Sequence, residues 1–258
     1  MLNLWNLWKS SSAKSSAGGL GANGAHSAAN HVPAFSKIAL GCGACHQFVR
    51  SVHRDGIDRG AITSFGNNFA IETGVTPSAY EISSGLTAFE RKVSSGRKEG
   101  TALYDGVVRL AESVSDFELA REHGRIGLML IVTDGVDMHS QRFAEAPERA
   151  GRAFRNRLSS YSKPWIVLLF GVGRDVDRHS LGLLAQAGEM RLHMVDDMAT
   201  FGAALNQLGT QIRVGMRTDC LAQDGWAVAV QRPFATMSVT PYDYVFLIDR
   251  SGSMQDAG

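Results

Sequence analysis

The sequence predicts a doubly wound α/β domain with a mostly parallel sheet and helices on both faces. Strand-length apolar segments alternate with segments of helical periodicity between Lys37 and Ile212. Two apolar segments run into an aspartate, Asp134 and Asp249, and their continuous hydrophobicity is typical of strands buried on both faces of a parallel sheet. The length of 258 residues suffices for one large domain, or for an ordinary domain with appendages.

The first half of the body contains a helix, two strands and two further helices. Apolar residues recur at helical spacing from Lys37, and this segment ends at Asp55-Gly56. Residues 57–65 and 69–72 are expected to be strands because the turn residues Gly-Asn-Asn separate them. Helices are expected near residues 85–93 and 102–114, on either side of the polar stretch 94–100.

The second half alternates more regularly. Residues 125–134 form an apolar run that ends in a carboxylate, and a helix is expected at about 146–158. A strand at 165–172, a helix at 178–187, a short strand at 191–195 and a helix at 198–212 follow. In such sheets ligands bind at the carboxyl ends of the strands, where the loops gather.

Two segments interrupt this pattern. Residues 1–36 are interpreted as a flexible arm, because residues 9–34 are rich in Ser, Ala and Gly and contain no acidic residue. Residues 213–241 are either a linker or an edge hairpin. Residues 242–258 then add one more buried strand, at 244–248, which we expect to complete the domain formed by residues 37–212.

Composition narrows the functional classes. Apolar residues make up 44% and charged residues 20% of the chain, as in ordinary globular proteins. A net charge of +1 gives no reason to expect nucleic acid as a partner. No apolar stretch approaches the ~20 residues that span a bilayer, and the N-terminus lacks the pattern of a secretory signal, so we expect a cytoplasmic protein.

The terminal strand leads into a loop rich in oxygen donors. Asp249, Ser251 and Ser253 form an Asp-x-Ser-x-Ser pattern with one carboxylate and two hydroxyls. Hard oxygen donors of this kind suit Mg²⁺, which keeps several of its waters.

Three motifs together resemble the metal-ion-dependent adhesion site of von Willebrand factor A domains. Asp-x-Ser-x-Ser is similar to its first element, residues 100–105 (Gly-Thr-Ala-Leu-Tyr-Asp) to its second, and residues 133–135 (Thr-Asp-Gly) to its third. The resemblance implies a Mg²⁺ site, with Mn²⁺ or Ca²⁺ as alternatives, and a protein ligand whose Asp or Glu completes the coordination. The metal residues carried over are Asp249, Ser251, Ser253, Thr101 and Asp134.

Three further residues are expected at the rim of this site. Gly135 follows Asp134 directly and permits a tight loop backbone, while Tyr104 and His139 lie within a few positions of Thr101 and Asp134.

The order of the motifs differs from that of the family, in which Asp-x-Ser-x-Ser comes first. Circular permutation explains this order, because joining residues 255–258 to Lys37 recreates a loop-to-helix passage. A truncated second domain is less consistent with the sequence, since residues 1–54 contain no Asp or Glu that could begin a first one. A third alternative is that the terminal strand of one chain completes the sheet of another, which would make a homo-oligomer.

Cys42, Cys45 and His46 fit the pattern of haem attachment. Haem would displace core from the first helix, and a redox dithiol should open a helix directly after a strand, so two packing cysteines are the favoured interpretation. Cys220 is alone in the linker, and no disulfide framework is implied.

No nucleophile with an adjacent base is visible, so we expect a binding module and not an enzyme. One alternative is an accessory subunit of an ATPase or chelatase-like complex. Another is an assembly protein that works by exchanging its terminal strand.

Overall fold

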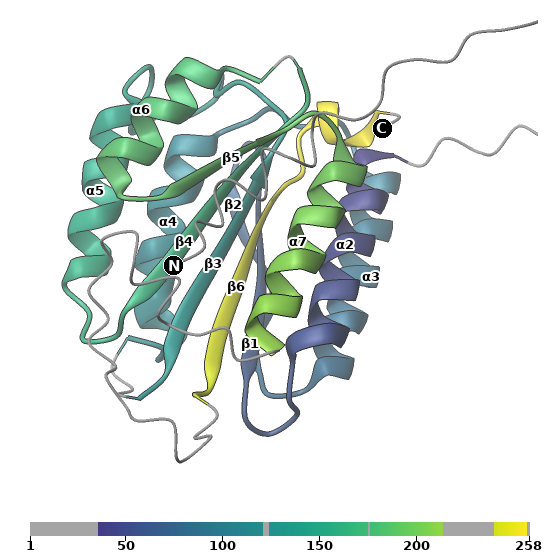
Figure 1. Ribbon diagram of the computed structural model, residues 1–258. Helices are drawn as coiled ribbons and strands as arrows, with labels where there is room; N and C mark the ends of the chain where they lie inside the picture. Colours follow the sequence, from purple (N-terminus) through teal and green to yellow (C-terminus); the bar gives the residue numbers. More distant parts are fainter. Residues whose placement is uncertain (1–35, 121–123, 175, 214–239, 257–258) are drawn as a thin grey trace, which may run out of the picture. The chain divides into compact units, whose positions relative to one another are not determined.

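A six-stranded sheet organises the computed structural model, which describes residues 36–120, 124–174, 176–213 and 240–256 (Figure 1). The strand order is β2-β1-β6-β3-β4-β5, and only the pair of β1 and β2 is antiparallel. The strands are β1 (Arg59–Phe65), β2 (Phe69–Thr76), β3 (Ile126–Thr133), β4 (Trp165–Val172), β5 (Arg191–Val195) and β6 (Tyr242–Asp249). The predicted mostly parallel α/β architecture is confirmed.

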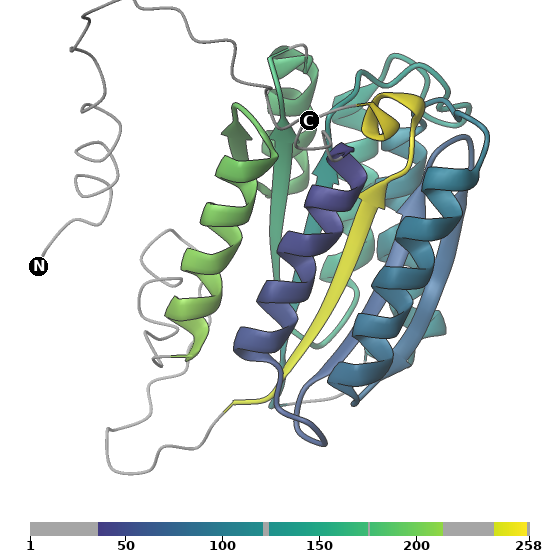
Figure 2. The same cartoon turned by 90° about the vertical axis from the view of Figure 1, so that its right-hand side faces the viewer.

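Helices cover both faces of this sheet. Of the helices in the described residues, three pack on one face and three on the other, and a short 3₁₀ helix follows β6 (Figures 1 and 2). The first face carries α2 (Lys37–Val52), α3 (Ala79–Ser95) and α7 (Met198–Arg213). The second carries α4 (Leu103–Asp116), α5 (Pro147–Ser159) and α6 (Arg178–Gly188), and the 3₁₀ helix is η1 (Gly252–Gln255).

The alternation of side chains along β6 explains why its sequence is apolar throughout. Tyr244, Phe246 and Ile248 pack into the core beneath α2, whereas Val245 and Leu247 pack into the core on the opposite face. All five are buried, so a polar residue at any of them would lose contact with water without gaining a partner.

Strand β6 lies in the middle of the sheet although it comes last in the chain. Phe246 pairs with Ile62 of β1 on one side and with Leu130 of β3 on the other, both in parallel register. The prediction that the terminal strand lies beside the strand leading to Asp134 is therefore confirmed. Asp249 and Asp134 consequently emerge at the same edge of the sheet.

The end of the β6 segment meets the beginning of α2. The Lys37 backbone N–H donates to the Asp256 carbonyl at 3.0 Å, and Figure 2 shows η1 close to the first turn of α2. Ser36 caps this helix, because its hydroxyl accepts from the Ala39 N–H. The loop after β6 and the start of α2 are thus in direct contact, although they lie at opposite ends of the described chain, as a permuted order requires.

Two boundaries differ from the sequence prediction by four residues or more. Strand β2 continues to Thr76, and α3 begins at Ala79, six residues before the predicted start. Ser78 is the helix cap, its hydroxyl accepting from the Glu81 N–H, and Thr76 bonds the Glu81 side chain in turn. The Ser-x-x-Glu spacing is a helix-start signal that apolar periodicity alone did not reveal.

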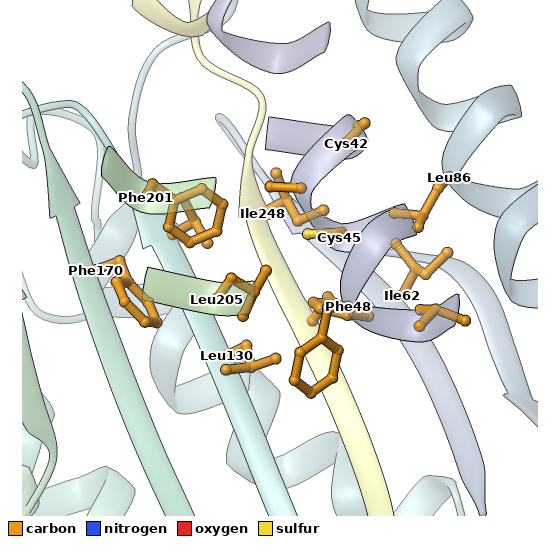
Figure 3. Packing of buried hydrophobic residues seen from close by; sticks show 14 of the residues in the cluster. Cys42, Cys45, Phe48, Ile62, Leu86, Leu130, Phe170, Phe201, Leu205 and Ile248 are labelled. Carbon is orange, nitrogen blue, oxygen red and sulfur yellow. The ribbon is translucent and has the colours of Figure 1, made fainter. Parts of the chain in front are cut away.

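The cysteines of α2 are core residues. Cys42 and Cys45 are 0% and 1% exposed and form no disulfide with each other. They pack beside Phe48 and Ile248 in the core on the first face of the sheet (Figure 3). Burial raises the pKa of the Cys42 thiol to about 12, so it is not a reactive thiolate at neutral pH. The interpretation of these residues as packing cysteines is confirmed.

Several sequence interpretations concern residues outside the described ranges. These are the N-terminal arm up to residue 35, the linker or hairpin at 214–239, and Cys220. Among the described helices, none is both long and apolar enough to cross a membrane.

A buried ion cluster anchors the beginning of β6 to its neighbours. Asp243 is fully buried and accepts hydrogen bonds from Arg59, Arg125 and Lys163, which come from or border β1, β3 and β4. Lys163 is itself buried, and its ammonium lies 4.9 Å from the centre of the Trp165 ring. Burial alone raises the pKa of Asp243, but the three basic partners outweigh it and lower the pKa to about 2.

Replacing Asp243 with asparagine should lower the free energy of unfolding by about 3–5 kcal/mol, because Lys163 would remain buried without its counter-charge. Glu148→Gln, which breaks an exposed pair with Arg152, should change it by less than about 0.5 kcal/mol. Urea unfolding followed by tryptophan fluorescence measures both variants. Equal, small losses in the two would show that the cluster does not hold β6.

A rearranged chain tests whether the described elements depend on their present order. It would run from Thr240 to Gly258, through a Gly-Ser linker of about four residues, into Ser36 and on to Arg213. Because Lys37 and Asp256 are already hydrogen-bonded, we expect a folded monomer with an unchanged circular dichroism spectrum. The same chain lacking residues 242–258 should not fold. An aggregated or unfolded rearranged chain would contradict the permutation interpretation.

Candidate functional site

Three loops at the carboxyl edge of the sheet bring the predicted metal residues together. The loop after β6 carries Asp249, Ser251 and Ser253, the loop between α3 and α4 carries Thr101, and Asp134 directly follows β3. Asp249 and Asp134 lie at the ends of neighbouring strands because β6 and β3 are paired in parallel register.

Asp249 is fully buried, and both of its carboxylate oxygens are engaged. Its Oδ2 accepts from the Thr133 hydroxyl at 2.7 Å, and its Oδ1 accepts from the Ser251 N–H at 2.8 Å. Burial, opposed by these hydrogen bonds and reinforced by the charge of Asp134, raises the pKa of Asp249 to about 7. The site therefore holds a carboxylate that lacks a compensating positive charge.

A chain of hydroxyl groups connects the serines to the second carboxylate. The Ser251 and Ser253 hydroxyls lie 2.9 Å apart, and Ser253 donates to Asp134 Oδ1 at 2.7 Å. The η1 turn brings Ser253 back towards Asp134, and the Gly252 N–H fixes the turn by donating to the Glu99 carbonyl. Four of the five predicted metal residues thus form one hydrogen-bonded group.

Thr101 joins this group across Gly135. A Cβ atom built on Gly135 would lie 2.9 Å from the Thr101 hydroxyl and 3.7 Å from Asp249 Oδ2. Both oxygens therefore flank the glycine, and a larger residue there would crowd them. The Thr101 carbonyl also accepts from the Met138 and His139 N–H groups, each at 3.0 Å, which ties the two loops together.

Asp105 holds the long loop after β3 in place, a role that the sequence analysis missed. Its carboxylate accepts from three consecutive backbone N–H groups, those of Gln141, Arg142 and Phe143. Asp105 is the last residue of the Gly-Thr-Ala-Leu-Tyr-Asp segment that also supplies Thr101. Its place in this motif is the sequence signal that could have identified it.

The rim residues are only partly where they were expected. Gly135 borders the site, and His139 is exposed with its imidazole against Gly100, next to Thr101. The prediction that Tyr104 lies at the rim is wrong, because this residue is 4% exposed and packs into the core on the second face of the sheet. It lies in the first turn of α4, whose apolar side faces the sheet and turns the tyrosine inward.

Two exposed apolar side chains and one lysine complete the surroundings and were not predicted. Val136 and Met138 are 42% and 77% exposed on the loop that also carries His139. Lys37, the first residue of α2, places its ammonium 2.6 Å from Asp134 Oδ2. Only the contact between the start of α2 and the β6 loop brings this lysine to the site, and no motif marks it.

Two surface hollows lie elsewhere. One of about 200 Å³ is lined by residues of α5, β4 and the segments after α5 and α6, and one of about 560 Å³ lies between α4 and α5. Neither includes any of the five predicted metal residues. The site is instead a group of mostly buried oxygen atoms at the sheet edge.

The raised pKa of Asp249 predicts a pH dependence of stability in EDTA. The pKa of Asp249 is about 7 in the folded chain and near 3.8 in the unfolded chain. Between pH 3.8 and pH 7 the folded chain therefore binds a proton that the unfolded chain does not. Lowering the pH from 7 to 4 should therefore stabilise the chain relative to Asp249→Asn, by at most about 1.4 kcal/mol per pH unit. Above pH 7 the full cost of burying the charge remains.

Urea unfolding of both proteins at pH 8, 7, 6 and 5 measures this difference. His46 and His193, whose pKa values burial lowers, are present in both proteins, and their contributions cancel. Parallel pH profiles for the two proteins would show that Asp249 titrates normally.

Comparison with known proteins identifies the fold. No protein family description and no curated protein sequence matches this chain. Among solved structures, the von Willebrand factor type A protein from Catenulispora acidiphila has a TM-score of 0.52 at 13% identity, covering 67% of this chain and 38% of that one. This chain thus spans well under half of the length of that protein.

Two other solved structures have lower TM-scores. The conserved hypothetical protein BatB from Bacteroides thetaiotaomicron scores 0.47 at 15% identity, over 67% of this chain and 87% of its own. Proximal thread matrix protein 1 from the mussel byssus scores 0.48 at 17% identity, over 70% and 41%. With the first comparison, the sheet order and the helices on both faces, the chain has the fold of a von Willebrand factor A domain.

Proposed function

We propose that this chain is a protein-binding module that holds Mg²⁺ at the carboxyl edge of its sheet and captures an acidic side chain of a partner. The observation that carries the proposal is the convergence of five oxygen-bearing side chains from three loops that are far apart in sequence. Four of them share hydrogen bonds, and the fifth lies across Gly135 from Asp249.

The donor set fits a hard divalent cation. Carboxylate and hydroxyl oxygens are the ligands that Mg²⁺ takes in proteins, usually together with several waters. Within the described residues, no three of His, Cys, Asp and Glu gather to hold a metal ion. A cation here would therefore depend on hydroxyls and water in addition to the two carboxylates, which favours Mg²⁺ over Zn²⁺.

The charges explain why an acidic partner suits the site. Asp249 and Asp134 together carry two negative charges, which would balance one Mg²⁺ without leaving a surplus to repel a further carboxylate. Asp249, Ser251, Ser253 and Thr101 would hold the ion directly or through water, and Asp134 would orient its waters. When bound, Mg²⁺ supplies an open coordination position for the partner's oxygen.

The surface around the site fits recognition and not catalysis. Val136 and Met138 are exposed beside Thr101, where they would contact the partner next to its acidic side chain. The proposed activity is therefore binding, and the order of motifs is proposed to reflect a circular permutation that closes within one chain.

Calorimetry of Mg²⁺ binding tests this function. The wild-type chain should bind one Mg²⁺ per molecule, and Asp249→Ala should abolish that heat, because it removes a carboxylate that no other described residue replaces. Asp256→Ala is the matched control, since Asp256 lies in the same segment but pairs with Lys98 at the surface. It should bind as the wild type does.

Equal binding by the wild type and Asp249→Ala would contradict the proposed site. Light scattering during the same titration distinguishes the alternatives. A monomer that binds Mg²⁺ supports closure within one chain, whereas binding seen only in an oligomer would favour strand exchange between copies.

A further inference from the structure

The salt bridge between Lys37 and Asp134 occupies the carboxylate that the proposed site needs. Lys37 Nζ lies 2.6 Å from Asp134 Oδ2, and the Asp134 side chain is 0% exposed while that of Lys37 is 27% exposed. Asp134 Oδ1 already accepts from Ser253. Both oxygens of Asp134 are therefore engaged in the metal-free chain, one of them by a positive charge.

An ammonium and a divalent cation cannot share this carboxylate without mutual repulsion. The repulsion acts over a short distance and next to fully buried groups, where water screens it poorly. Ser253 is neutral and can turn its hydroxyl to become a ligand, whereas the charge of Lys37 must move away. The lysine is thus the group whose position distinguishes the metal-free state from a metal-bound one.

We propose that Lys37 is a built-in competitor that sets the affinity of the site for its cation. This inference rests on the proposed function. In the metal-free chain the ammonium neutralises Asp134, and Mg²⁺ binds only by displacing it. The affinity for Mg²⁺ is consequently lower than the five oxygen donors alone would give.

The location of Lys37 allows this exchange without unfolding α2. The helix is fixed by its backbone, through the bond from the Lys37 N–H to the Asp256 carbonyl and through the Ser36 cap. The side chain is long, partly exposed and tied to the site only at its Nζ atom.

Lys37→Met tests the proposal, because methionine keeps an unbranched side chain of similar length and removes the charge. Calorimetry should give a Mg²⁺ dissociation constant about tenfold or more below that of the wild type. Lys37→Arg, which keeps the charge, should stay near the wild type. Lys98→Met is the matched control, since Lys98 is exposed and pairs with Asp256 instead of with a proposed ligand.

Thermal unfolding in EDTA and in Mg²⁺ provides an independent readout. In EDTA, Lys37→Met should unfold at a lower temperature than the wild type, because Asp134 is left buried without a counter-charge. In saturating Mg²⁺ this deficit should shrink, because the ion supplies the missing counter-charge and a tenfold lower dissociation constant adds about 1.4 kcal/mol to the stability of the variant relative to the wild type. A variant destabilised equally in both conditions would show that Lys37 is only structural.

Two failures can be told apart. Equal dissociation constants for the wild type and Lys37→Met, with no binding by Asp249→Ala, would overturn the competition and leave the metal site intact. Absence of binding by every variant would overturn both proposals. If Lys37→Met does not fold, Lys37→Gln and the ¹⁵Nζ resonance of wild-type Lys37 replace it, and the resonance must change on addition of Mg²⁺.

Discussion

The pairing of β6 between β1 and β3 is the constraint on which the rest of the structure depends. Without this strand the two halves of the sheet would have no common neighbour, and the side chains of α2 would lose Tyr244, Phe246 and Ile248 as packing partners. The edge contacts of Phe48 with Tyr244 and Phe246, at ring distances of 5.8 and 6.0 Å, belong to the same core. Hydrophobic burial therefore holds the strand that carries Asp249.

Strand β6 has a buried carboxylate near each end, and the groups around the two carboxylates differ in charge. Asp243 is surrounded by Arg59, Arg125 and Lys163, so its charge is compensated and its pKa is low. Asp249 receives only hydrogen bonds from neutral groups, and its pKa rises to about 7. The carboxylate at the amino end is thus charge-compensated, whereas the one at the carboxyl end has a strongly raised pKa, and such shifts cluster at functional sites.

Much of the fold could be predicted because its signals are local. The apolar run of β6 and the Thr-Asp-Gly exit of β3 each report on burial and on a strand end, and parallel pairing then brings Asp249 and Asp134 together. The start of α3 was misplaced because a cap, and not hydrophobicity, determines it. Tyr104 was misplaced because sequence distance from Thr101 does not reveal which side of α4 faces the sheet.

What could not be predicted depends on contacts between distant segments. Lys37 and Asp134 are 97 positions apart, and the ammonium reaches the carboxylate only because the start of α2 meets the end of the β6 segment. The partners of Asp243 are similarly spread over β1, the region before β3 and the region before β4. Such ionic contacts leave no periodic pattern in the sequence, since each involves a single side chain.

Paramagnetic broadening by Mn²⁺ tests most directly whether the three loops form one cation site. Mn²⁺ takes oxygen ligands like Mg²⁺ and broadens the NMR signals of nearby amides. We predict that substoichiometric Mn²⁺ selectively broadens the amides of residues 100–102, 134–136 and 250–254 together, and that excess Mg²⁺ restores them. Broadening confined to one of these loops, or centred on other acidic residues, would contradict this prediction.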